Sequence, residues 1–280
     1  MMNVRSAYLA PVSLLAIPTI FFMAFFLAPM LVVVISSFSS AQGETLSHYT
    51  AILFDQYHWG VILITLRLSA LTTVICVLLG YPLAYYLMRT VSGTHWRRAC
   101  IVLLILPLFT SNIVRSFGWM VLLGRNGMVN ESLVSLGVLD SPMRFIGTET
   151  GILIGLVYIN LPFVVLAVGN ALGRVDTSLE AAARDLGAGA ARTFWSVTFP
   201  LCLPGLLAGA IMVFALSASA YVTPALLGGG RITMFSMLIF QQYSTVFDFN
   251  YGGALSMTLL VLTLILVGVA GKLGSKRTTA

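Results

Sequence analysis

Long stretches without a charged residue limit the possible folds of this chain more than any other feature of its sequence. No Asp, Glu, Lys or Arg occurs in residues 6–43, 150–173 or 193–230. A helix needs about 20 mostly apolar residues to cross a membrane, so each of these stretches is long enough. Of the 280 residues, 59% are hydrophobic and only 9% are charged. These values exclude a water-soluble globular enzyme and a disordered chain, and they indicate a protein with several membrane-spanning segments.

The charge-poor segments predict six membrane-spanning helices. Their expected bounds are about residues 14–38, 60–88, 99–123, 150–173, 201–223 and 249–271. The segments lack the alternation of apolar and polar residues found in barrel strands, so helices are the expected spanning element. The first segment is longer than the apolar region of a signal peptide, and we expect it to remain as an anchor. The sequence therefore predicts an all-α membrane protein in which residues 1–280 form one transmembrane domain.

The distribution of basic residues predicts the orientation of these spans. With six spans both termini lie on one side, together with ten of the 15 lysines and arginines, whereas three lie on the other side. Cytoplasmic loops are enriched in Lys and Arg, so we expect both termini in the cytoplasm. The net charge of +6 then reflects orientation in a lipid bilayer, and we expect no nucleic-acid partner.

Several common catalytic and nucleotide-binding motifs are absent from the sequence. It contains no G-x-x-x-x-G-K-[ST], G-x-S-x-G or H-E-x-x-H pattern, and His48, His58 and His95 fall in loops on opposite sides of the membrane. No Asp or Glu lies inside the six spans, although proton-coupled carriers usually need such carboxylates. We therefore expect no catalytic residue, metal or cofactor in this chain, and an energy source in another chain.

The loop 174–200, predicted to be cytoplasmic, has the strongest helical signals outside the spans. Thr177 and Glu180 match a T-x-x-E capping box, and Gly187 is a typical residue just after a helix end. The three alanines between them favour a helix. One face of this short helix would be apolar, with Leu179, Ala182, Ala183 and Leu186. Because no core of its own chain lies beside it, we expect the helix to dock on a partner.

This loop resembles the EAA loop of the membrane subunits of bacterial binding-protein-dependent ABC importers. In that pattern Glu-Ala-Ala is followed, after three further residues, by Gly, and the Pro of a Leu-Pro pair stands thirteen residues after that Gly. Gly187 and Pro200 keep this spacing, with Phe199 in the Leu position. The Glu position falls on Ala181, and Glu180 stands one residue early. Glu180 either caps its helix or replaces the displaced Glu, or Arg184 and Asp185 make the polar contact instead. The resemblance implies an ATPase-coupling set of Glu180, Ala181, Ala182, Ala183, Arg184, Asp185, Gly187 and Pro200.

Other segments extend the resemblance over residues 60–271. They read LGYPLAYYL, PLFTSNIVRSFGW, GLVYINLPF and YVTPALLGGG, and they are similar to permeases of the spermidine/putrescine (polyamine) type. The resemblance implies a non-catalytic subunit with a type I ABC importer permease fold in the bacterial inner membrane. It also implies an ABC ATPase dimer that binds ATP and Mg, a second related permease that makes a heterodimer, and a periplasmic solute-binding protein.

Polar residues within the spans are the candidates for a substrate path. Asn112 and Arg115 are three residues apart and so share one helix face. Tyr158 and Asn160 lie in the fourth span, and Tyr221 ends the fifth. Arg115 lies close enough to the outer end of its span that its side chain has an alternative position at the membrane surface. Its charge favours an anion, whereas the acidic bias of the outer loops favours a cation, so the sequence leaves the solute open.

Three other readings remain beside a polyamine importer. Similar permeases serve aminophosphonates, opines or other small organic ions, so the importer class is better defined than its solute. An independent carrier or channel would need inverted repeats or carboxylates within the membrane, and neither is present. A membrane enzyme would need a cluster of nucleophilic, metal-binding or acid–base groups, which the spans lack.

Overall fold

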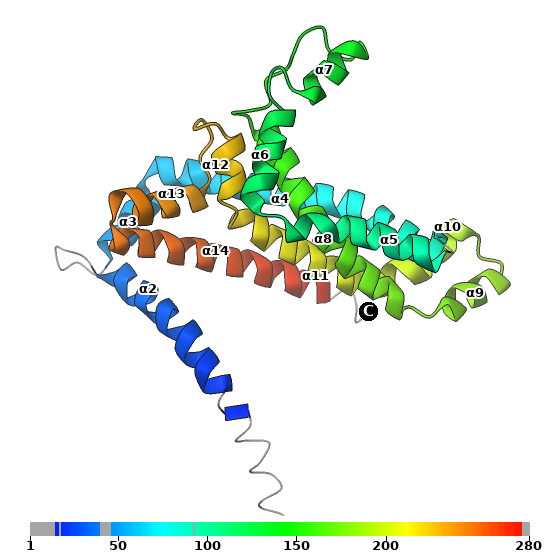
Figure 1. Ribbon diagram of the computed structural model, residues 1–280. Coiled ribbons are helices and arrows are strands. Elements are labelled where there is room, and N and C mark those ends of the chain that lie inside the picture. Colours follow the sequence, from blue (N-terminus) through cyan, green and yellow to red (C-terminus); the bar gives the residue numbers. More distant parts are fainter. Residues whose placement is uncertain (1–14, 17, 40–45, 92, 276–280) are drawn as a thin grey trace, which may run out of the picture. The chain divides into compact units, whose positions relative to one another are not determined.

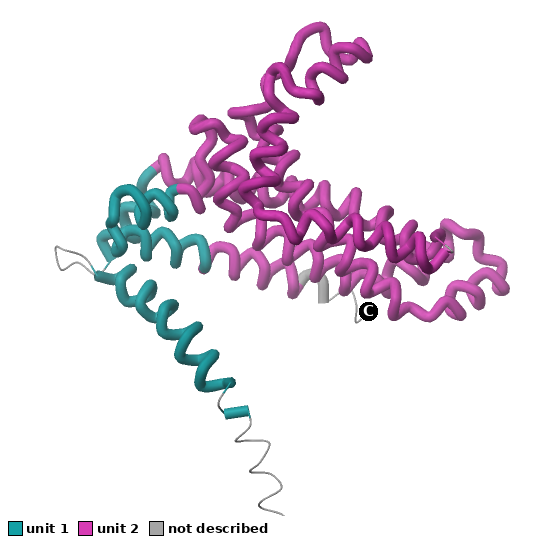
Figure 2. Tube along the Cα trace, in the orientation of Figure 1, with its two compact units in different colours: residues 1–55, 238–260 teal, residues 56–237, 261–280 magenta. Residues whose placement is uncertain are grey.

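The computed structural model describes residues 15–16, 18–39, 46–91 and 93–275. Helices form most of this part of the chain, and it contains no β-strand (Figure 1). Its contacts divide the chain into two compact units (Figure 2): residues 1–55 with 238–260, and residues 56–237 with 261–280. The single domain expected from the sequence stays a prediction, and the two units are described separately.

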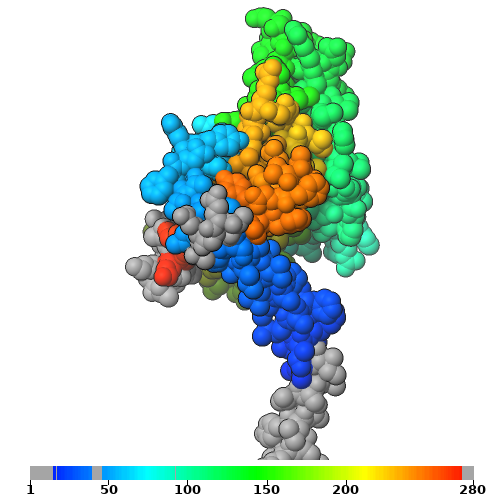
Figure 3. All heavy atoms as spheres, turned by 90° about the vertical axis from the view of Figure 1, so that its left-hand side faces the viewer, coloured from blue at the N-terminus to red at the C-terminus, as the bar shows by residue number. Residues whose placement is uncertain are grey.

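The first unit contains the N-terminal span. The unit comprises η1 (Met23–Leu27), α2 (Ala28–Phe38), α3 (Ser47–Phe54), the end of α13 (Phe235–Gln241), η5 (Gln242–Val246) and the beginning of α14 (Phe249–Ser275). Residues Pro18–Phe38 are long and apolar enough to cross a membrane, and no side chain in their most apolar stretch is buried. The exposed side chains of α2 are visible in Figure 3. The predicted beginning of this span, residue 14, lies outside the described residues.

Three helices form the core of the second unit. They are α4 (Gln56–Tyr85), which continues through the π-helical turn η2 (Tyr86–Thr90), α8 (Glu149–Arg174) and α11 (Phe199–Ala218). Glycines allow close packing between them, as expected for helices in a membrane. A Cβ atom on Gly80 would lie 3.0 Å from Val164, and one on Gly205 would lie 2.4 Å from Ala171. The second and fifth spans therefore both pack directly against the fourth.

The third span is bent, unlike the continuous helix expected at residues 99–123. Helix α5 (Thr94–Ile105) and the 3₁₀ turn η3 (Leu106–Phe109) are followed, at an angle of 100°, by α6 (Asn112–Leu122). The break has a local cause: Pro107 has no backbone N–H to continue the helix, and the Ser111 hydroxyl caps the new one by accepting from Ile113 N–H at 3.3 Å. With this bent pair counted as one span, the described residues contain six candidate spans.

The fifth span begins and ends earlier than the predicted residues 201–223. Its helix runs through α10 (Ala190–Thr193), the π-helical turn η4 (Phe194–Thr198) and α11, and it ends at Ala218. The wider turn η4 ends two residues before Pro200, a residue at which an ordinary helix loses a hydrogen bond. Residues beyond Ala218 form a separate short helix, α12 (Val222–Leu227). The prediction of one continuous helix to residue 223 is therefore wrong.

Three short helices complete the described chain. They are α7 (Met128–Ser135) between the third and fourth spans, α9 (Thr177–Asp185) between the fourth and fifth, and α13 (Phe235–Gln241) before the sixth. Helix α9 lies together with α10 beyond the ends of α5 and α8 (Figure 1).

Candidate functional site

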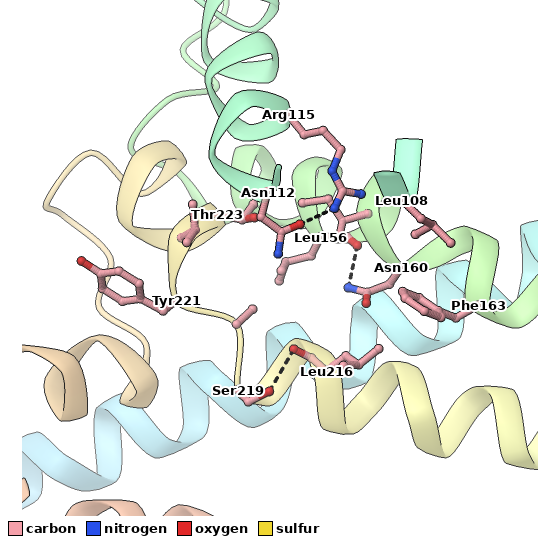
Figure 4. Close-up of a pocket in the computed structure, with 13 residues that line it drawn as sticks. Leu108, Asn112, Arg115, Leu156, Asn160, Phe163, Leu216, Ser219, Tyr221 and Thr223 are labelled. Carbon is pink, nitrogen blue, oxygen red and sulfur yellow. Dashed lines mark hydrogen bonds between the residues drawn. The ribbon is translucent and has the colours of Figure 1, made fainter. Parts of the chain in front are cut away.

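A cavity of about 420 Å³ lies where the third span bends and the fifth ends (Figure 4). Side chains from η3, α6, α8, α11, the turn that follows α11 and the beginning of α12 line it. Its polar lining consists of Asn112, Arg115, Asn160, Ser219, Tyr221 and Thr223. No carboxylate belongs to the lining, so its only formal charge is positive. The cavity is large enough for a small polar molecule.

Four of the five path residues expected from the sequence line this one cavity: Asn112, Arg115, Asn160 and Tyr221. The fifth, Tyr158, does not; its ring packs edge-on against Trp119 with 5.3 Å between centroids. Ser219 and Thr223 line the cavity but were not predicted, because the sequence suggested an unbroken span to residue 223. The small polar run around Ser217 and Ser219 was the available signal for the break.

Arg115 has unused hydrogen-bond donors beside this cavity. One terminal nitrogen donates to the Asn112 side chain, three residues earlier on α6. The Nε and Nη1 atoms are buried and have no hydrogen-bond partner within the described residues. Because Nε and Nη1 are shielded by the protein, a solute in the cavity meets the charge of Arg115 rather than these two donors.

Two further contacts hold the walls of the cavity together. Asn160 is 3% exposed, and its Nδ2 donates to Leu156 O at 2.9 Å and to Ser217 Oγ at 3.3 Å, which joins α8 to α11. The hydroxyls of Ser116 and Thr223 lie 3.1 Å apart and join α6 to α12. The cavity is therefore bounded by helices that are tied to one another by buried polar contacts.

The other arginine within the predicted spans does not line the cavity. Arg67, on α4, forms an ion pair with Glu149 at the beginning of α8. The pairing gives both charges a partner, so neither needs a role in solute binding.

Helix α9 begins differently from the sequence prediction. Its N-cap is Asp176, whose Oδ1 accepts from Ser178 N–H at 2.9 Å, so the predicted capping box of Thr177 and Glu180 is wrong. Asp176 lies in extended backbone directly before the helix, from which a short carboxylate reaches the free N–H groups. This hydrogen bond from the Ser178 backbone, together with one from the Ser178 side chain, holds the pKa of Asp176 below its usual value.

The end of α9 agrees with the prediction. Gly187 has a φ of +83°, which favours glycine, and its N–H donates to Arg184 O at 2.9 Å. Ala188 N–H donates to Ala183 O at 3.0 Å, which completes a Schellman motif. Gly187 therefore ends the helix, as its position in the sequence predicts.

Most of α9 is exposed to solvent. Leu186 is 90% exposed and Leu179 is 48% exposed, although both are large and apolar. Other predicted coupling residues are also exposed: Ala181, Ala182, Arg184, Asp185, Gly187 and Pro200, with Ala183 half-buried. The expectation of an apolar face without a core to cover it is confirmed for Leu179 and Leu186.

Glu180 is the exception on this helix. It is 8% exposed, and its Oε1 lies 3.0 Å from Arg89 Nη2 and accepts a hydrogen bond from Thr198 Oγ1 at 3.1 Å. Its carboxylate therefore points into the protein and does not cap the helix.

These features define a class of protein: a helical membrane permease with a polar cavity between its spans and an exposed helix beyond them. No cluster of His, Cys, Asp or Glu in the described residues is suited to hold a metal. The chain belongs to the family of binding-protein-dependent transport system inner membrane components, whose model matches residues 76–271. The family consists of ABC transporter permeases.

Individual relatives agree with this membership. The chain is 34% identical over 252 residues to the spermidine/putrescine transport system permease protein PotB of Haemophilus influenzae, covering 88% of this chain and 87% of the relative. It is 35% identical over 218 residues to PotB of Escherichia coli, covering 78% of each chain. A chain of a bacterial ABC transporter involved in the import of the acidic polysaccharide alginate has the same fold, with a TM-score of 0.78 and 17% identity over 98% of this chain and 97% of that one.

Proposed function

We propose that this chain is a transmembrane subunit of an ATP-driven importer that carries polyamines such as spermidine or putrescine across the bacterial inner membrane. The observation that carries the proposal is the similarity to PotB proteins, which extends over 88% of this chain. The cavity at the bend of the third span is the candidate passage for the solute. Both termini are proposed to face the cytoplasm.

The energy for transport would come from a separate ATPase dimer, which binds the ATP and Mg. In this proposal α9 is the coupling helix, and its exposed apolar residues, with Leu186 foremost, enter a cleft on the ATPase. ATP binding moves the coupling helices and switches the permease between inward and outward states, as a rigid-body change biased by a ligand on the partner. A periplasmic solute-binding protein would deliver the solute to the outer loops.

A second, related permease is proposed to complete the passage. Arg115 would repel a polycation: two positive charges about 6 Å apart cost about 3 kcal/mol at an effective dielectric constant of about 20. Because the cavity has no carboxylate, acidic groups for a polyamine would have to come from outside this chain. A heterodimer, in which the second permease differs from this one, meets that requirement.

A small organic anion such as an aminophosphonate is the second candidate solute. The positive charge of Arg115, in a cavity lining without a carboxylate, favours it, because a guanidinium attracts and binds oxyanions.

Uptake by the reconstituted importer distinguishes these candidates. The chain, its ATPase, the second permease and the binding protein are placed in liposomes, and uptake of spermidine, putrescine and 2-aminoethylphosphonate is measured with and without ATP. ATP-dependent uptake of a polyamine supports the first proposal. Uptake of the phosphonate alone would replace it with the second, and transport by this chain without an ATPase would refute the importer class.

A further inference from the structure

A buried carboxylate on an otherwise exposed helix needs an explanation. Glu180 has a side chain that is only 10% exposed, while its neighbours Ala181 and Ala182 are exposed. Removing a carboxylate from water is costly unless it is paired and hydrogen-bonded. Glu180 meets both conditions, through Arg89 at 3.0 Å and the Thr198 hydroxyl at 3.1 Å.

The contacts of Glu180 join α9 to two membrane spans. Arg89 lies in η2, at the end of the second span, and Thr198 ends η4, directly before α11 in the fifth span. Arg89 Nη2 also donates to Val175 O at 3.2 Å, in the residue that follows α8. One buried ion pair therefore connects the short helix with the second and fifth spans and with the end of the fourth.

Aromatic rings pack the second and fifth spans together at the level of this pair. Tyr81 packs against Phe194 and Phe199, with ring centroids 5.7 and 5.6 Å apart. Tyr85 packs against Phe194 at 5.5 Å. The side chain of Arg89 is 15% exposed. The junction is thus packed and largely shielded from water, where an ion pair is screened less than at a surface.

The fifth span leads from this junction to the cavity. Thr198 precedes α11, and the other end of α11 carries Leu216 and the following Ser219, which both line the cavity. A helix is a rigid element, so a displacement at Thr198 is carried along α11 to these residues. The contacts form a continuous path from α9 to the cavity.

We infer that the Arg89–Glu180 pair links the coupling helix to the second and fifth spans and transmits its movement to the cavity. The inference rests on the proposed function. Glu180 is a positioning residue in this account: its carboxylate faces the protein's own spans, and the ATPase meets the exposed residues of α9 instead. The pair must hold in both states for the helix and the spans to move together.

Single and paired substitutions in the complete importer test this link. We expect Glu180→Gln and Arg89→Gln each to lower ATP-dependent uptake about tenfold or more, because each leaves the remaining charge buried without its partner. Uptake by the double variant should be at most about threefold lower than uptake by either single variant, because the two substitutions remove the same interaction. Arg89→Lys keeps the charge and should retain part of the uptake. Arg192→Gln, which removes an exposed arginine of the same loop, is the control and should leave uptake unchanged.

Copurification of the ATPase separates a link from a docking contact. The single variants should retain as much bound ATPase as the wild type and continue to hydrolyse ATP, so that hydrolysis is no longer matched by uptake. Loss of the bound ATPase in Glu180→Gln, unchanged uptake in either single variant, or multiplied losses in the double variant would each overturn the inference. If the wild-type chain showed no ATP-dependent uptake, the proposed function would fail instead.

Trypsin digestion of the chain alone gives a result that does not depend on transport. Arg184 lies on exposed α9 and is a cleavage site. If Glu180 anchors this helix, Glu180→Gln should speed cleavage after Arg184 several-fold in the solubilised full-length chain, while cleavage after Arg125 in the loop before α7 stays at the wild-type rate. Equal rates after Arg184 in the variant and the wild type would contradict the anchoring.

Discussion

Gly155 is a residue at which the packing of α8 leaves no room for a side chain. A Cβ atom there would lie 2.5 Å from Leu227 Cδ1 and 2.7 Å from Thr223 Cγ2, both on α12. Leu227 is completely buried, so it has no free space into which to turn. Thr223 in turn lines the cavity and meets the hydroxyl of Ser116. The close approach of α8 and α12, which shapes one wall of the cavity, therefore requires a residue without a Cβ atom at position 155.

Gly155→Ala should destabilise the second unit and disturb the cavity. We expect a loss of about 1–3 kcal/mol, the usual cost of extra volume in a packed core. Gly173→Ala is the matched control: it lies on the same helix with no atom within 4 Å of the added Cβ, and alanine is the better helix former. Thermal unfolding of the solubilised chain measures the difference. An unchanged or higher midpoint of thermal unfolding for Gly155→Ala would show that α12 moves to fit the added methyl group without loss of stability.

At the scale of the element, α9 combines an internal face and an external one. Glu180 holds it to the spans, while Leu186 stands at its end with 90% of its surface exposed. A large apolar side chain in that position contributes nothing to the chain's own core, so its burial by a partner would stabilise only the complex.

Leu186→Ser should therefore weaken ATPase binding without weakening the fold. Loss of a buried leucine at an interface costs about 1–3 kcal/mol, or roughly 5- to 150-fold in affinity. Leu136→Ser makes the same change at a leucine that is 76% exposed in the loop before the fourth span, and it should leave binding unchanged. The amount of ATPase that copurifies with each variant is the measurement. Equal amounts of copurified ATPase for the two variants would show that Leu186 is not part of the docking surface.

The elements also show what the sequence can and cannot predict. The apolar segments are identified correctly because about 20 apolar residues have few alternatives to a membrane span. The bend before Asn112 and the early end of α11 were missed because the polar runs at residues 110–112 and 217–219 are short and uncharged, so they do not interrupt a charge-poor segment. Glu180 matched a capping pattern by spacing alone, and its pairing with Arg89, 91 positions away, is a tertiary contact that no local pattern contains. Four cavity residues could be predicted because they are polar residues in apolar spans: Asn112, Arg115, Asn160 and Tyr221. Ser219 and Thr223 could not, because they reach the cavity only through the break between α11 and α12.

For the whole molecule, the distribution of charge makes a prediction about its orientation in the membrane. The loops and termini assigned to the cytoplasm together hold ten of the 15 basic residues. That assignment places α9 on the side where ATP is found and the loop around α7 on the opposite side, which the proposed function requires. A reversed chain would present α9 to the periplasm, where a cytoplasmic ATPase could not reach it.

Single cysteines at two exposed leucines test this orientation. With Cys76, Cys100 and Cys202 replaced by alanine, Leu136→Cys should react with a membrane-impermeant maleimide added outside intact spheroplasts, because we place its loop in the periplasm. Leu186→Cys, which is at least as exposed, should react only after the membrane is opened. The two positions serve as controls for each other, since both must label fully in detergent. The reverse labelling pattern would show the opposite orientation in the membrane, and it would exclude α9 as the docking site of a cytoplasmic ATPase.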